Sequence, residues 1–115
     1  MAMTVVSIAR DYSPSPAGRT PADGPFNGER FRDNILLPAL QQAAEKNDKV
    51  VVDLDDAYSY SSSFLEEVFG GLVRKHVFEA AKLASLLEIR ATNPIYESFK
   101  RDATKYFHDA LKAQG

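Results

Sequence analysis

Two adjacent serines, Ser62 and Ser63, stand where a polar turn gives way to an apolar helical pattern. A serine hydroxyl at such a position can receive a phosphate from a kinase, which adds about −1.5 to −2 charges. The same hydroxyl can instead cap the helix, because Ser63 and Glu66 have the spacing of a capping box. The sequence therefore predicts a phosphoacceptor at Ser62 or Ser63, a helix cap at Ser63, or both.

Polar and aromatic residues surround the serine pair. They are Tyr58, Ser59, Ser61, Glu66 and Glu67. Exposed tyrosines are frequent among the residues that dominate protein–protein binding energy. Nearby carboxylates would make such a surface sensitive to an added phosphate. We expect these residues to form a partner-binding surface, with packing inside the fold as the alternative role for Tyr58 and Tyr60.

Other residues that could do chemistry do not assemble into a recognisable site. Asp53, Asp55 and Asp56 close a predicted strand and could offer oxygen ligands to Mg²⁺, but nothing supplies the rest of a phosphate-receiver site. The two histidines, His76 and His108, fall in separate helical segments, and no G-x-S-x-G nucleophile motif occurs. We therefore predict no catalytic residue, no metal site, no cofactor and no enzymatic activity.

A second possible binding site opens the first long helical pattern. Gly28, Arg30 and Arg32 follow a loop rich in proline and glycine. Helix N-termini attract anions, and the two arginines would add to that attraction. No glycine-rich phosphate cradle with Lys and Ser/Thr accompanies them. An anion-binding or small-ligand sensor is thus the alternative function, and an Arg–carboxylate pair inside the fold is the competing structural role.

Composition narrows the class of protein. The 115 residues suit one domain, and 14 basic against 16 acidic residues give a formal net charge of −2. Nucleic-acid binding needs a surplus of basic residues, so we expect no nucleic-acid partner. No apolar run approaches the roughly 20 residues that span a bilayer, and the N-terminus lacks a charged leader pattern. Without cysteines as well, we expect a cytoplasmic protein with no membrane partner.

The order of the predicted elements indicates the fold. Strands are expected at 4–9, 49–55 and 85–91, and helices from about 28, at about 63–76, at 78–84 and from Asn93-Pro94 onward. Alternation of this kind predicts an α/β fold with a small mixed, largely parallel sheet and helices packed on it. We expect a single domain over residues 1–115, with a Pro/Gly/Ser-rich arm at about 12–27.

Two features interrupt the helical patterns. Pro38 lacks an N–H and should bend the first helix or divide it. Gly70-Gly71 weakens the second helix by roughly 1 kcal/mol per glycine relative to alanine. A glycine pair at that place predicts a kink or the close approach of another backbone. The valines Val50, Val51 and Val52 predict a strand buried on both faces.

The segment from Val50 to Leu72, VVVDLDDAYSYSSSFLEEVFGGL, resembles the phosphorylatable segment of STAS domains, the sulphate-transporter and anti-sigma-factor-antagonist domains. Ser62-Ser63 matches the serine pair of that segment. The similarity is closer to a bacterial STAS-like family of unknown function, over roughly residues 26 to 92. Ser61 stands where the antagonists carry Asp, and Phe64 where they carry Gly.

The resemblance implies a STAS-like fold and a regulatory protein-interaction role, switched by phosphorylation at Ser62 or Ser63. The partner that it implies is a histidine-kinase-like ATPase or another signalling protein. A non-switching structural module that forms a homodimer is a further alternative, which the sequence leaves open.

Overall fold

Three short segments pair side by side into one parallel sheet in the computed structural model, which describes residues 2–114. Strand β1 is Met3–Ser7, β2 is Lys49–Asp53 and β3 is Leu87–Arg90, in the order β1-β2-β3. Val5 lies opposite Val51, which lies opposite Glu88. Parallel strands require crossover connections, which the helices provide. The predicted α/β class is confirmed, and the three strands are all parallel.

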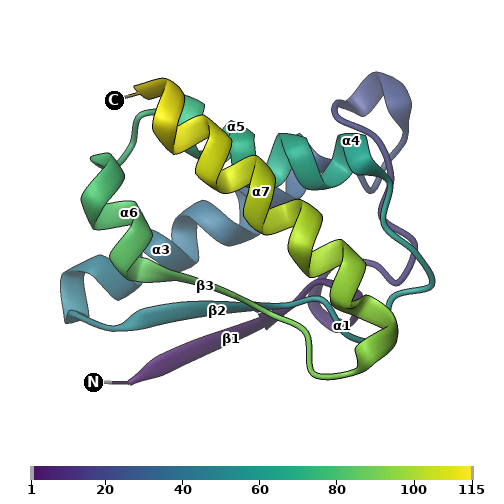
Figure 1. Cartoon of the computed structure of the whole chain (residues 1–115), viewed down its shortest axis with the longest axis horizontal. Helices are drawn as coiled ribbons and strands as arrows, with labels where there is room; N and C mark the ends of the chain where they lie inside the picture. Colours follow the sequence, from purple (N-terminus) through teal and green to yellow (C-terminus); the bar gives the residue numbers. More distant parts are fainter. Residues whose placement is uncertain (1, 115) are drawn as a thin grey trace.

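The helices are interrupted by short irregular turns. Their bounds are α1 Ile8–Asp11, α2 Gly28–Phe31, α3 Leu37–Lys46, α4 Ser62–Leu65, α5 Gly71–Arg74, α6 Ala80–Leu86 and α7 Glu97–Gln114. Pro21–Asp23 and Pro94–Tyr96 form single 3-10 turns. Helix α7 crosses over α4 and α5 on the same side of the sheet as α3 and α6 (Figure 1).

Two wide π-helical turns join the short helices into longer units. The turn η2, Arg32–Leu36, connects α2 to α3, and the turn η3, Glu66–Gly70, connects α4 to α5. Within η2 the Leu37 N–H donates to the carbonyl of Arg32, five residues back. Pro38, which has no N–H to donate, follows directly, so the bend that it predicts takes the form of this turn.

The central strand is buried as its three valines predict. Val50, Val51 and Val52 are all fully buried. Val50 and Val52 belong to the main core beneath the helices. Val51 is flanked on its own face by its register partners Val5 and Glu88. These contacts hold the sheet as a rigid base for the loops that leave its C-terminal edge.

Two strand boundaries differ from the prediction. The first strand ends at Ser7, because the Ser7 hydroxyl accepts from the Arg10 N–H and starts α1. The third strand begins at Leu87, because Ser85 still belongs to α6 and donates from its hydroxyl to the Lys82 carbonyl. In both places a local helical hydrogen bond overrides an apolar, strand-like pattern. The last helical segment begins after Asn93 as predicted, and the Asn93 side chain caps it by accepting from the Ile95 N–H.

Aromatic side chains connect the arm to the core. The ring of Tyr12 lies 5.3 Å from Phe31 and 6.4 Å from Phe64, measured between centroids. Its hydroxyl donates to the Asn27 carbonyl at 2.8 Å. Arm residues 12–27 are therefore an ordered loop that packs at both ends. No helix within residues 2–114 is long and apolar enough to cross a bilayer.

Replacing Phe64 tests this aromatic core. Phe64 is fully buried, so Phe64→Ala should lower the free energy of unfolding by about 3–5 kcal/mol through lost contacts and a cavity. Phe26→Ala is the matched control, because Phe26 is 44% exposed and should cost about 1 kcal/mol or less. Urea unfolding followed by circular dichroism measures both. Equal losses would contradict this assignment of the core.

Candidate functional site

Ser61, not Ser63, caps the helix at the predicted site. Its hydroxyl oxygen accepts from the Phe64 N–H and from the Gly18 N–H, each at 3.2 Å. The prediction that Ser63 caps the helix together with Glu66 is wrong. Helix α4 begins at Ser62, one residue earlier than expected, and the Glu66 carboxylate binds arginines instead. Ser61 thus holds the helix start and the arm together.

The two candidate phosphoacceptors differ in accessibility. Ser62 is exposed, whereas Ser63 is half-buried. The Ser63 hydroxyl lies 3.3 Å from that of Ser61. A kinase must reach the hydroxyl that it modifies, so the structure favours Ser62 over Ser63 as the accessible serine.

Tyr58 stands out from the surface beside these serines. It is 83% exposed, and its N–H donates to the Pro14 carbonyl at 2.8 Å. A shallow groove of about 300 Å³ runs between the turn and the arm. It is lined by Ser15, Pro16, Ala17, Tyr58, Ser59 and Ser61. The exposed turn and the arm therefore make one continuous surface.

Tyr60 has the opposite environment. It is 4% exposed, and its hydroxyl donates to the Leu54 carbonyl at 2.7 Å. Burial raises the pKa of Tyr60 well above its usual value, because the phenolate would lose its solvation. Of the two tyrosines that flank the turn, Tyr60 packs in the core and Tyr58 is available to a partner.

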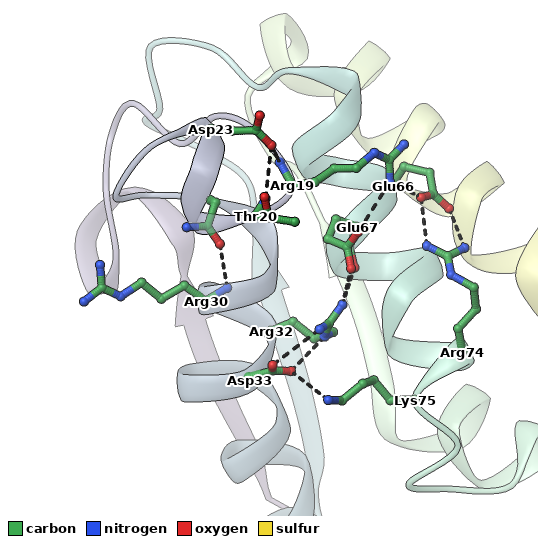
Figure 2. A network of polar contacts seen from close by, with 11 residues as sticks. Arg19, Thr20, Asp23, Arg30, Arg32, Asp33, Glu66, Glu67, Arg74 and Lys75 are labelled. Atoms are coloured by element: carbon green, nitrogen blue, oxygen red, sulfur yellow. Dashed lines mark hydrogen bonds and ion pairs between the residues drawn. The ribbon is translucent and has the colours of Figure 1, made fainter.

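Glu66 and Glu67, expected on the partner surface, are engaged in a network of ion pairs (Figure 2). The Glu66 carboxylate binds Arg74 through two contacts, at 2.7 and 2.8 Å, and Arg19 at 2.6 Å. Glu67 binds the Arg32 guanidinium and lies 3.5 Å from Arg19. Their side chains are only 23% and 18% exposed. Both carboxylates therefore bind arginines within the fold rather than standing free on the surface.

Arg32 lies at the buried end of this network. Its side chain is 6% exposed, and it donates to the Glu67 carboxylate, to the Glu67 carbonyl at 3.2 Å and to Asp33 at 2.8 Å. Lys75 approaches Asp33 at 3.7 Å. The hydrogen bond from Arg32 lowers the pKa of Asp33. The predicted Arg–carboxylate role is thus the one that Arg32 fills.

The predicted anion site is not open in this structure. The Gly28 N–H donates to the Gly18 carbonyl and the Glu29 N–H to the Arg19 carbonyl, both at 2.9 Å. The Arg30 N–H donates to the Asn27 side chain, also at 2.9 Å. The arm therefore satisfies the first-turn amides that an anion would use. The Arg30 guanidinium donates to the Pro25 carbonyl at 3.0 Å.

The three aspartates at the end of β2 and just after it bind separate partners. Asp53 pairs with Arg90 at 3.4 Å, and Asp56 pairs with Arg10 at 3.1 Å. Asp55 accepts from the Thr92 hydroxyl and from the backbone amides of Thr92 and Asn93. Burial acts to raise the pKa of Asp55, but these hydrogen bonds outweigh it and lower the pKa. No group of three metal-ligating side chains converges within residues 2–114.

The glycine pair makes room for charged groups. A Cβ on Gly71 would lie 2.5 Å from Nη1 of Arg32 and 3.0 Å from Oε2 of Glu67. A Cβ on Gly70 would meet the Glu66 carboxylate and Arg74. The predicted approach of another backbone is wrong, because the groups that meet these two glycines are charged side chains.

Sequence reasoning did not identify Arg19 or Arg74 as part of the site. The pairing of Arg74 with Glu66 could have been found from the sequence, since Arg74 follows Glu66 by two helical turns on the same helical unit. The pairing of Arg19 with Glu66 could not have been found in this way, because Arg19 lies 47 residues from Glu66 in an arm without periodicity. Only the folded arm brings it to the carboxylates.

A family model described as "STAS-like domain of unknown function (DUF4325)" matches residues 27–97. The match runs from Asn27, the cap of α2, to Glu97, the first residue of α7. It includes the turn with Tyr58 and the four serines at 59 and 61–63, but not Arg19. No curated protein and no solved structure matches the chain.

Gly71→Ala tests the space that the buried ion pair requires. Alanine normally favours a helix over glycine by about 1 kcal/mol. Here its methyl group must displace Arg32 from Glu67, so we expect a loss of about 2 kcal/mol or more in chemical denaturation. Ser85→Ala, an exposed change on α6, should stay within about 0.5 kcal/mol of wild type. A stabilised Gly71→Ala protein would refute this account.

Acid should weaken the fold through Glu66. Hydrogen bonding to Arg74, opposed by burial and reinforced by Arg19, lowers the pKa of Glu66 below 4.5 in the folded chain. The stability that this carboxylate contributes is therefore present above pH 4.5 and is lost as the pH falls through the lower folded pKa.

Urea midpoints measured from pH 6 to 3 should consequently fall less steeply for Glu66→Gln than for wild type. Asp102→Asn, at an exposed position in the interior of α7, should keep the wild-type slope. Identical slopes for Glu66→Gln and wild type would show that the ion pairs of Glu66 do not stabilise the fold.

Proposed function

The chain belongs to the STAS-like domain family, and from this membership we propose that it is a regulatory protein-interaction domain rather than an enzyme. The observation that carries the proposal is Tyr58, 83% exposed beside a groove between the turn and the arm. Leaving a large aromatic ring in water forgoes the free energy of its burial. A partner that covers the ring would recover that free energy.

The proposed binding surface comprises the groove, Tyr58 and the exposed serines. Tyrosine suits such a position because its ring gives contact area and its hydroxyl gives a hydrogen bond. The backbone beneath it is anchored at Ala57, whose carbonyl accepts from the Tyr96 hydroxyl at 2.6 Å. A rigid, pre-formed surface loses little conformational entropy on binding.

The proposed switch is phosphorylation of Ser62 by a serine kinase. The γ-phosphoryl group of ATP passes to the Ser62 hydroxyl oxygen, ADP leaves, and the hydroxyl proton is released. The added charge lies one residue from the cap Ser61, at the border of the groove. A partner that fits the neutral surface would then face a dianion. The partner class suggested by the resemblance is a histidine-kinase-like ATPase or another signalling protein.

Two other functions have less support from the site. An anion sensor at Gly28, Arg30 and Arg32 would compete with the arm for amides that already have partners. A purely structural homodimer would not need an exposed serine beside its groove. The homodimer gives a distinct result in the experiment below.

Photocrosslinking tests the proposed surface. A photoreactive amino acid placed at Tyr58 should capture a heterologous partner in the native cell, and one placed at Val77, in the turn after α5, should not. With that partner purified, Tyr58→Ala should weaken binding at least tenfold, about 1.4 kcal/mol. Val77→Ala, also a change at an exposed apolar residue (43%), should leave the affinity unchanged.

Crosslinks from Tyr58 only to a second copy of the chain would favour the homodimer. Affinity that is equally insensitive to both substitutions would reject this surface.

A further inference from the structure

The ion-pair network beside Ser62 carries one positive charge in excess. Its cations are Arg19, Arg32, Arg74 and Lys75, and its carboxylates are Asp33, Glu66 and Glu67 (Figure 2). Four positive charges against three negative ones leave a surplus of one. A partly buried network with a surplus cation favours the addition of an anion at its edge.

Arg19 is the cation that can leave the network without leaving a carboxylate unpaired. Arg32 is buried, and Arg74 binds Glu66 through two nitrogens. The Arg19 side chain is 43% exposed. When Arg19 turns away, Glu66 keeps Arg74 and Glu67 keeps Arg32. No carboxylate is then left buried without a partner, which is the costly outcome.

Ser62 lies one helical turn before the carboxylate that this arginine binds. The Glu66 N–H donates to the Ser62 carbonyl, so the two side chains lie one helical turn apart on one face, with Cβ atoms about 5–6 Å apart. The Arg19 guanidinium sits 2.6 Å from the Glu66 carboxylate. The preceding residue, Gly18, is held on Ser61 at the start of the same helix. Arg19 is therefore held near the start of α4 by its neighbour Gly18, and near Glu66 by its own guanidinium.

We propose that Arg19 is the residue that binds a phosphate carried by Ser62, exchanging Glu66 for the phosphate. The inference rests on the proposed function, because it takes Ser62 as the modified serine. Arginine binds phosphate through paired, charge-assisted hydrogen bonds. The exchange moves the surface of the arm and leaves Glu66 to Arg74 alone, so the modification changes the shape of the docking surface as well as its charge.

Ser63 does not offer the same exchange. One turn along the helix from Ser63 lies Glu67, whose carboxylate is bound to the buried Arg32. A phosphate on Ser63 would also crowd the hydroxyl of Ser61, 3.3 Å away, and weaken the cap and the anchor of the arm. The geometry therefore assigns the two serines different outcomes. A phosphate on Ser62 would bind Arg19, whereas a phosphate on Ser63 would disrupt the site.

The test uses the full chain with phosphoserine genetically encoded at position 62. Titration by ³¹P NMR should give a second phosphate pKa that is lower by about 0.3–0.7 with Arg19 than in Arg19→Gln, as expected for an exposed ion pair. Arg10→Gln, which removes an arginine 77% exposed and paired with Asp56, should leave the phosphate pKa unchanged. Arg19→Lys should recover part of the difference.

The amide resonance of Gly18 controls for the arm. If Arg19→Gln loosens the arm, this resonance moves in the unphosphorylated protein, and the comparison is then made between wild type and Arg19→Lys. A phosphate pKa indifferent to every change at Arg19, or one that responds to Arg74→Gln instead, would overturn the inference. The experiment needs neither kinase nor partner, so its failure would leave docking at Tyr58 standing. Failure to find a partner would equally leave this result intact.

Discussion

The buried guanidinium of Arg32 is the constraint around which the helical layer is arranged. A charge removed from water is tolerated only with close partners, and breaking such a pair costs several kcal/mol. Arg32 finds its partners in Glu67 and Asp33, and through Glu67 it joins the helical unit 28–46 to the unit 62–74. Two glycines make that approach possible. A Cβ on Gly71 would strike the guanidinium, and one on Gly28 would lie 2.9 Å from the Phe64 carbonyl. The weak helix-forming tendency of these glycines is the cost of the ion pair.

The network changes character from its buried end to its surface end. At the buried end, the Arg32 guanidinium binds Glu67 and Asp33, and its pair with Glu67 joins the two helical units. At the surface end, Glu66 has two arginines, and one of them reaches it from the arm. Charge-assisted contacts that exist in surplus can be exchanged without unfolding, whereas single buried ones cannot. This gradient explains how one set of charges can both stabilise the domain and leave an adjustable contact beside the exposed serine.

The arm performs several tasks that its loop-like composition does not suggest. Its carbonyls satisfy the first amides of α2, its Gly18 amide is held by the cap of α4, and its Pro14 carbonyl accepts from Tyr58. The arm therefore links the starts of both helical units to the exposed turn, which keeps the groove in one shape. The family match begins at Asn27 and excludes most of the arm. Arg19 consequently lies outside the segment by which the family is recognised, while Glu66 and Arg74 lie inside it.

The sequence by itself determined the features that depend on near neighbours. β-Branched runs such as Val50–Val52 specify strands, Asn93-Pro94 starts a helix, Pro38 forces a bend, and the alternation of elements implies a parallel sheet. The tertiary structure decided which serine caps α4, because only Ser61 can also accept from Gly18, 43 residues away. It likewise decided that Tyr60 is buried while Tyr58 is exposed, and that the amides of the expected anion site are filled by the arm. Contacts such as Arg19–Glu66 join segments far apart in the chain. They leave no periodic trace in the sequence, because their geometry exists only once the core has brought those segments together.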